Sequence, residues 1–423
     1  MRIATSQFYS ANVQSMDNQQ AQLAQLNQEI SSGTTINTPA DNPLGAAQAV
    51  QLTMTTATLT QYTTNQSSAL TSLQLEDNTL TSVTNVMQSM STLIVQAGDE
   101  SLNDGDRGAI ARELQSFRSQ LLTLSNTTDG AGNYIFSGFQ SKTQPFTDVP
   151  GVGVQYSGDT GQRLVQVAGN RQISTSDSGV GVFQSVPSLG TQPVPGGPAA
   201  GSPPNTGTGT IGPVTITDPS QPSNNDSYSI VFGTDPVTSA PTYTVSETTA
   251  GAPPTTTTMP AVTYTPGSDI QIKLGAGMTT TISGTPNSGD SFNVTPATTQ
   301  ANANVFNTLD SVIAALQAPV SSTQAGFANL SNTLSQAATA FHNSMTNVTM
   351  IQASVGGREQ ELQALQTSTS SNTLQAQSNL ANITDVDMVS TISQFEQVQN
   401  ALSAAQKSFV QVQNLSLFQY ITN

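Results

Sequence analysis

The side chains that most often carry catalysis are nearly absent from this sequence. It contains no cysteine and a single histidine, His342, among 423 residues. Cysteine nucleophiles, disulfide frameworks and thiolate zinc sites are therefore excluded, as is every site that needs several histidines. His342 lies at helical spacing beside Phe341 and Met345 with no serine or cysteine motif nearby, so a base there would have no nucleophile to activate. The glycine pairs within 151–153 and 275–277 do not extend to a nucleotide-binding loop and predict turns. We expect no enzyme activity, no metal and no cofactor.

The acidic run 99–106, Asp-Glu-Ser-Leu-Asn-Asp-Gly-Asp, has the composition of a calcium loop. If Gly105 takes the place of the invariant loop glycine, Leu102 and Ala111 fall on ligand positions, and neither side chain binds a cation. We therefore expect a loop between two helices whose acidic residues cap the second helix at its positive end.

The charge and apolar content of the chain indicate which kinds of partner it can bind. The chain has 10 Lys and Arg against 26 Asp and Glu, a net charge of −16, and only 9% charged residues, compared with roughly 25% in an ordinary domain. So few cations cannot neutralise many phosphates, which argues against nucleic acid. No run of about 18 apolar residues predicts a membrane span. Residues 1–7 lack the apolar core of a signal peptide, so export would have to read another signal.

Proline separates two regions that are free to be helical from a middle that is not. There is no proline between Pro43 and Pro145, only Pro319 follows Pro296, and nine of the 22 prolines lie in 187–222. Because proline breaks helices, we expect long helices at both ends of the chain and β-structure between them.

The N-terminal region carries apolar stripes with alternating spacings of three and four, which are typical of coiled-coil seams. The first stripe ends before Gly33, a plausible helix stop, and a helix over 45–97 would be about 80 Å long. Another helix is expected from near Asp106 to near Gly130. The first stripe comprises Tyr9, Val13, Met16, Gln20, Leu23, Asn27 and Ile30.

The C-terminal region mirrors this pattern. A helix opens at Val305 and is expected to continue, bent at Pro319, past Met345, with a weak point at Gly356-Gly357. Helices with one apolar stripe need partners, so we expect the first and last helices to pair with each other or with other subunits. The final stripe comprises Phe395, Val398, Leu402, Ala405, Phe409 and Val412, followed by Leu415 and Phe418. The candidate assembly interface is therefore Val13, Met16, Leu23, Ile30, Phe395, Val398, Leu402, Phe409, Val412, Leu415 and Phe418.

The predicted fold class is mainly α with inserted β: a long coiled-coil bundle built from both chain ends, with a β-rich middle. The short β-prone runs are separated by Gly and Pro, and the segment 187–225 reads as linker. The expected strands include 134–136, 152–156, 164–167, 228–232, 243–245, 270–274 and 291–294. The predicted division is 1–40 with 385–423 as terminal helices, 41–132 with 301–384 as a bundle, 133–186 as a β-rich domain and 187–300 as a Pro/Thr/Gly-rich insertion.

Four runs carry a resemblance to a known family. They are 31–47 (SSGTTINTPADNPLGAA), 130–138 (GAGNYIFSG), 309–316 (LDSVIAAL) and 415–420 (LSLFQY). With this architecture, they make the chain similar to the bacterial flagellar axial proteins, most of all to the hook–filament junction family, hook-associated protein 3. The resemblance covers roughly 1–183 and 302–423. From the residues alone, Pro39 and Pro43 push the residues before them away from helix, and Asp41 and Asn42 accept local N–H bonds, so a shaped connector is expected there.

The resemblance implies a structural subunit that is exported unfolded through the flagellar type III apparatus, with an export chaperone. It also implies a place in the extracellular flagellum between hook-associated protein 1 and flagellin, self-association into a ring or helical layer, and terminal helices that order only on assembly. Two alternatives remain open at this point: a flagellin-type filament subunit, and a Thr-rich adhesin suggested by residues 187–300.

Overall fold

The computed structural model describes residues 2–184, 186, 194–198, 202–218, 220–250, 253–265, 270–296, 304–320 and 324–421. It divides into two compact units. The terminal unit comprises residues 1–66, 167–169 and 363–423, and the central unit comprises residues 67–166 and 170–362. The predicted fold class, mainly α with an inserted β region, is confirmed.

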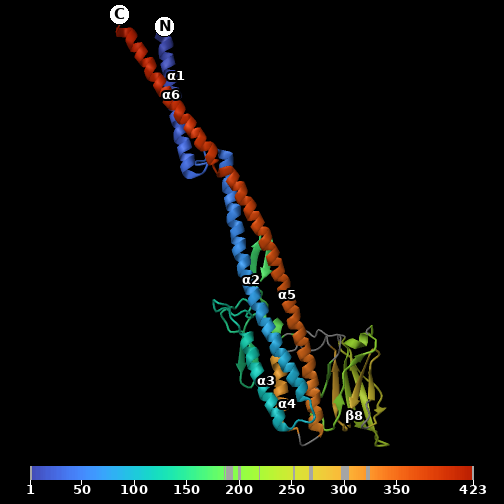
Figure 1. Cartoon of the computed structure of the whole chain (residues 1–423). Helices are drawn as coiled ribbons and strands as arrows, with labels where there is room; N and C mark the ends of the chain where they lie inside the picture. Colours follow the sequence, from blue (N-terminus) through green and yellow to red (C-terminus); the bar gives the residue numbers. More distant parts are fainter. Residues whose placement is uncertain are drawn as a thin grey trace. The chain divides into compact units, whose positions relative to one another are not determined.

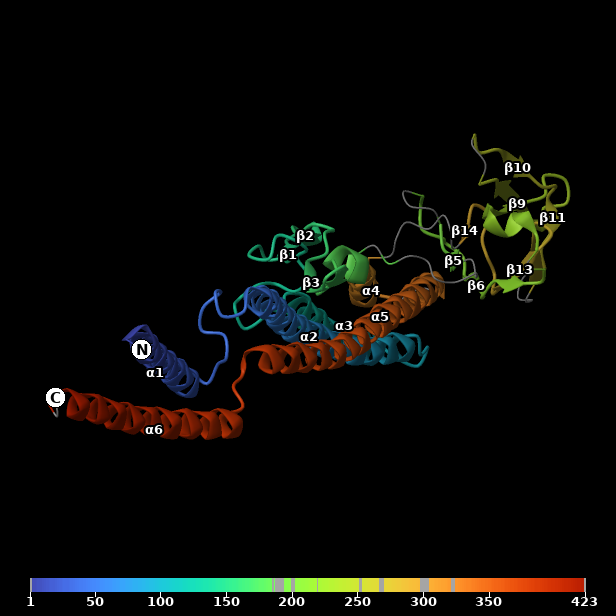
Figure 2. The same cartoon turned by 90° about the horizontal axis from the view of Figure 1, so that it is seen from above.

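The terminal unit is built on two long helices from opposite ends of the chain. Helix α1 (Arg2–Ser32) and helix α6 (Met388–Ile421) lie side by side, with the two chain ends at the same end of the pair (Figure 1 and Figure 2). Helix α2 (Pro43–Ala97) and helix α5 (Gln324–Thr384) each contribute to both units. The helix expected over 45–97 is confirmed.

The connector between α1 and α2 is shaped by a glycine with positive φ and by local hydrogen bonds of two polar side chains. Gly33 has φ +71°, a conformation that only glycine adopts without strain. Asp41 Oδ2 accepts the N–H groups of Asn37 at 3.1 Å and Thr38 at 2.7 Å. Asn42 Oδ1 accepts the Gly45 N–H at 2.9 Å, so Asn42 caps α2. The expected local bonds of Asp41 and Asn42 are confirmed.

The central unit combines helices with two small hairpins, except for residues 167–169 at the tip of the second hairpin, which belong to the terminal unit. Helix α3 (Asp104–Ser125) and helix α4 (Val305–Gln317) pack together. The hairpins are β1 (Phe146–Val149) with β2 (Gly153–Tyr156), and β3 (Leu164–Ala168) with β4 (Arg171–Ser174), followed by a π-helical turn at Val180–Gln184. Phe136, Phe146, Phe183 and Phe306 form the core here, with ring centroids 5.4–6.2 Å apart.

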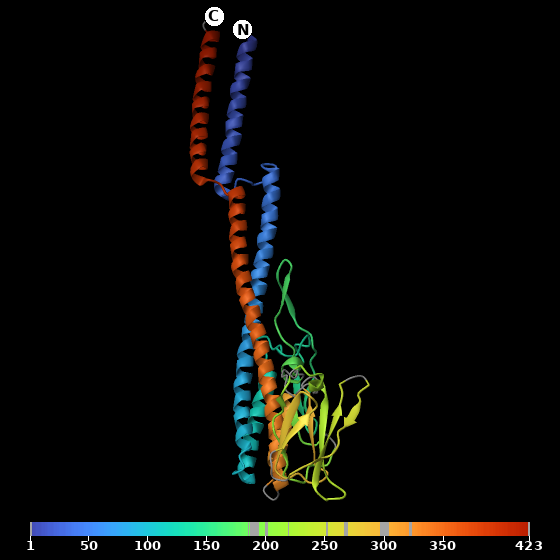
Figure 3. The same cartoon turned by 90° about the vertical axis from the view of Figure 1, so that its right-hand side faces the viewer.

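The rest of the central unit is a β-module of antiparallel strands around an apolar core. One sheet has the order β10-β9-β8-β14-β5, with β11 on β9, and the other has β12-β13-β6, with β7 on β13. Both sheets contribute to one core that includes Tyr228, Phe232, Tyr243, Ile282 and Phe292. Figure 3 shows this module beside the first part of α5. There, Asn332 Oδ1 accepts the Ile211 N–H at 3.1 Å. The strands are β5 (Val194–Gly196), β6 (Thr210–Ile211), β7 (Thr215–Ile216), β8 (Ser227–Thr234), β9 (Pro241–Thr248), β10 (Thr256–Thr258), β11 (Val262–Thr263), β12 (Ile270–Leu274), β13 (Met278–Ser283) and β14 (Ser291–Thr295).

Several local expectations differ from the structure. The segment 134–136 is a turn, with only an isolated bridge from Tyr134 to Thr128, because Gly132 and Gly138 reverse the backbone with positive φ. The helix from Val305 is interrupted and not merely bent, since Ala318 before Pro319 is extended at ψ 136°. The helix expected to reach Gly130 ends at Ser125. The pair Gly356-Gly357 lies inside α5 without a break.

Candidate assembly interface

Helices α1 and α6 form an antiparallel pair that contacts near both of its ends. Near the chain ends, the rings of Tyr9 and Phe409 lie with their centroids 5.0 Å apart and tilted by 45°. At the other end, a short backbone bridge joins the two connectors: the Thr35 N–H donates to Thr384 O at 2.7 Å, and the Val386 N–H donates to Gly33 O at 3.1 Å. The predicted pairing of the first and last helices therefore occurs within one chain.

The seam of α1 is rotated relative to the sequence expectation. Gln20 and Asn27 are exposed, whereas Gln19 is half-buried and Leu26 is buried. An α-helix turns every 3.6 residues and drifts about 20° per heptad from a strict 3.5-residue repeat. Leu26 is therefore buried at the place where the sequence pattern predicted Asn27. The predicted interface residues on this helix, Val13, Met16, Leu23 and Ile30, are all half-buried.

The seam of α6 retains the predicted spacing. Its described members are half-buried in the single chain: Phe395, Val398, Leu402, Ala405 and Phe409. Val412, Leu415 and Phe418 belong to the helix, but their side chains lie outside the described part of the structure. For the members whose side chains the structure describes, it brings the two halves of the candidate interface together and leaves each side chain partly uncovered.

Further apolar side chains of the terminal unit are strongly exposed, and they lie outside the predicted seams. Val389 is 82% exposed and Leu44 is 71% exposed. In the sequence, these residues are marked only by being apolar at positions outside the stripes of three- and four-residue spacing. The remaining members are Val50, Met54, Leu374, Met388, Ile392 and Val410.

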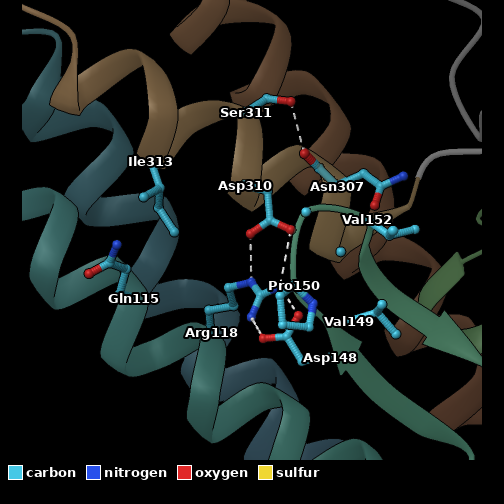
Figure 4. A pocket seen from close by; sticks show the side chains of 12 residues that line it. Gln115, Arg118, Asp148, Val149, Pro150, Val152, Asn307, Asp310, Ser311 and Ile313 are labelled. Carbon is cyan, nitrogen blue, oxygen red and sulfur yellow. Dashed lines mark hydrogen bonds and ion pairs between the residues drawn. The ribbon is translucent and has the colours of Figure 1, made fainter.

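A cavity in the central unit is lined by a cluster of ion pairs, shown in Figure 4. Its volume is about 850 Å³, and it lies among α3, the β1–β2 hairpin and α4. Arg118 donates to both oxygens of Asp148, at 2.7 and 3.0 Å, and its Nε lies 2.6 Å from Asp310 Oδ1. The Arg118 guanidinium holds the pKa of Asp148 below its usual range. Because both carboxylates already bind this arginine, the cluster ties three elements together and presents no free base.

The other side chains considered for chemistry, His342 and the acidic run 99–106, lie on a helix surface and at a helix cap. His342 is exposed on α5. Asn103 caps α3 by accepting the Asp106 N–H at 3.0 Å, and the Asp106 carboxylate accepts the Asn103 N–H in return, so an acidic residue takes part in the cap together with Asn103. Within the described ranges, no cluster of three or more His, Cys, Asp or Glu side chains could hold a metal ion. None of the described helices combines the length and apolar character needed to cross a bilayer.

Comparisons with known proteins match this chain to proteins of the bacterial flagellum. The bacterial flagellin N-terminal helical region matches residues 3–141. The chain is 27% identical over 419 residues to "Flagellar hook-associated protein 3" of Escherichia coli K12, covering 99% of both chains. The crystal structure of Xanthomonas campestris FlgL is 30% identical with a TM-score of 0.63, covering 74% of this chain and 98% of that one. Flagellin B of Vibrio cholerae is 25% identical over 153 residues, covering 36% of this chain and 38% of the flagellin.

Proposed function

Because this chain belongs to the hook-associated protein 3 family of bacterial flagellar proteins, we propose that it is the structural adaptor that joins the hook to the flagellin filament. The observation that carries the proposal is the match to a hook-associated protein 3 along 99% of both chains. Flagellum assembly and swimming would then depend on this subunit. The chain acts in this proposal as a structural subunit and not as an enzyme.

The terminal unit supplies the means of assembly in this proposal. Half-buried seam residues such as Leu402 and Phe409, together with exposed residues such as Val389, leave apolar area for neighbouring subunits to cover. Subunits that each present a different face to the next can stack head to tail into rings or helical layers. The partners we propose are further copies of this chain, hook-associated protein 1 on the hook side and flagellin on the filament side. An export chaperone and the type III apparatus would deliver the subunit to the extracellular flagellum.

A filament-subunit function has less support. The flagellin comparison reaches 36% of this chain, against 99% for the hook-associated protein. A flagellin would also be expected to make up the filament itself, so its loss would remove filament mass and not the attachment point. The two functions therefore predict different phenotypes.

Electron microscopy of a strain that lacks this chain tests the proposal. We expect hooks without filaments and flagellin shed into the medium, with both restored by the wild-type chain supplied from a plasmid. Filaments that remain attached in the deletion strain would refute the adaptor function. Loss of filaments without flagellin in the medium would also count against it, because an adaptor is not required for flagellin export.

A further inference from the structure

Glu76 on α2 is a buried carboxyl group whose environment is incomplete. Its exposed fraction is 1%. Its Oε1 accepts the backbone N–H of Asp177 at 2.9 Å, while its Oε2 is buried with no hydrogen-bond partner among the described residues. The buried Asp290 of the β-module differs, because the N–H groups of Thr206, Gly207 and Asn287 all donate to it. An ionised oxygen without donors is costly to bury.

The charged groups around Glu76 come from three elements and do not neutralise it. Arg358 on α5 pairs with the carboxylate of Asp177 and donates to Ser174 O at 3.1 Å. Arg163 lies before β3, and its Nε donates to Ser176 Oγ at 3.3 Å. Within the described residues, no ion pair joins Glu76 to either arginine. The nearby Asp177 carboxylate further opposes a negative charge on Glu76.

Glu76 lies at the junction in the central unit where the β3–β4 hairpin, α2 and α5 meet. The segment 174–177 includes the end of β4, and it is bound both by Glu76 on α2 and by Arg358 on α5. Arg171 in β4 also binds Glu361 on α5, at 2.5 and 2.6 Å. A change in the charge of Glu76 therefore acts on the point where the hairpin, α2 and α5 meet.

We propose that Glu76 is a proton-dependent latch. The neutral carboxyl group stays buried between α2 and the segment 174–177. Once it ionises at alkaline pH, the buried charge on the unpartnered Oε2 favours an opening that admits water, and this outweighs the stronger hydrogen bond that the carboxylate accepts from the Asp177 N–H. The neutral carboxyl group keeps Oε1 as the acceptor for the Asp177 N–H and carries the proton on the otherwise unpartnered Oε2. The latch depends on these contacts within the central unit and is independent of the proposed function in the flagellum.

The sign of the pH dependence follows from burial. Desolvation, reinforced by the Asp177 carboxylate, raises the pKa of Glu76 from its ordinary 4.5 to about 8. The stabilisation by the neutral form is complete below pH 4.5, decreases as the pH rises, and is lost once the pH passes about 8. Between pH 6 and pH 9, linkage predicts an increase of about a hundredfold in the opening equilibrium of this segment.

Hydrogen exchange of the Asp177 amide in the purified full chain tests the latch. After correction for the intrinsic effect of pH, we expect wild-type protection to fall by about a hundredfold from pH 6 to pH 9. In Glu76→Gln, which cannot ionise, protection should be nearly constant. The matched control is Glu113→Gln, which removes an exposed carboxylate of α3 outside this junction and should retain the wild-type pH dependence.

Equal pH dependence in the wild type and Glu76→Gln would overturn the proposal. Asp177→Asn provides a second arm that does not depend on the folding of the glutamine variant. Removing the neighbouring carboxylate should move the midpoint of the alkaline change to lower pH, since Asp177 raises the pKa of Glu76. A midpoint that stays in place in Asp177→Asn would also overturn it.

Discussion

Replacing Phe409 by aspartate should separate folding of the chain from assembly. In the single chain, Phe409 is half-buried and its ring packs on Tyr9 with centroids 5.0 Å apart. An aromatic pair of this kind contributes about 0.5–1.5 kcal/mol beyond the area it buries. The central unit has its own aromatic core, which includes Phe146 and Phe183. We therefore expect Phe409→Asp to cost about 1–2 kcal/mol in the terminal helix pair, with little change in circular dichroism.

The loss should be larger in the assembled flagellum. If neighbouring subunits cover the rest of the Phe409 ring, removing the ring lowers the stability of the assembly by about 3–5 kcal/mol, as for any buried phenylalanine. An unpaired carboxylate in the same place adds a further few kcal/mol. The total exceeds the loss in the free chain by several kcal/mol per subunit, so we expect Phe409→Asp to abolish filament attachment.

The assay counts attached filaments by electron microscopy and measures the secreted chain in the same cultures. Ser408→Asp is the matched control, because it places the same charge on an exposed neighbouring position of α6. It should leave attachment intact. Normal filaments with normal secretion in Phe409→Asp would refute the view that this ridge is an assembly surface. Loss of secretion in Phe409→Asp alone would place the effect in export.

Three further predictions concern the other parts of the chain. Limited proteolysis of the purified monomer should remove roughly residues 1–40 and 385–423, since these helices have half-exposed seams; full protection of both, seen by mass spectrometry, would contradict this. Replacing residues 187–300 by a short Gly/Ser link should leave swimming intact, because the paired terminal helices lie outside the insertion; a secreted, folded variant that cannot hold a filament would refute it. Arg118→Met should lower the free energy of unfolding by about 1–3 kcal/mol at pH 7, because two partly exposed carboxylates lose their cation. Asp148 has a lowered pKa in the folded wild type, so this difference should shrink as the pH falls below its ordinary 3.8, and a difference that is constant down to pH 3 in denaturant titrations would contradict the role of the ion pairs.

The sequence by itself determined the types of the long elements. Proline is missing from 44–144 and apolar residues recur at three–four spacing there, and these are local properties that favour one conformation over many turns. Short β-prone runs separated by Gly and Pro likewise predicted strands such as β8 and β14, which the structure contains. Periodicity indicated that the terminal helices need partners, and the resemblance indicated that the assembly is the flagellum.

Only the tertiary structure decided which side of each helix is covered and which distant groups meet. Leu26 faces inward in place of Asn27 because the real helical repeat departs from the heptad. Arg118 meets Asp310 across 192 positions of sequence, and Glu76 meets the Asp177 amide across 101. No local pattern encodes such pairs, since the cost of burying a charge and the partners that offset it depend on how separate elements pack.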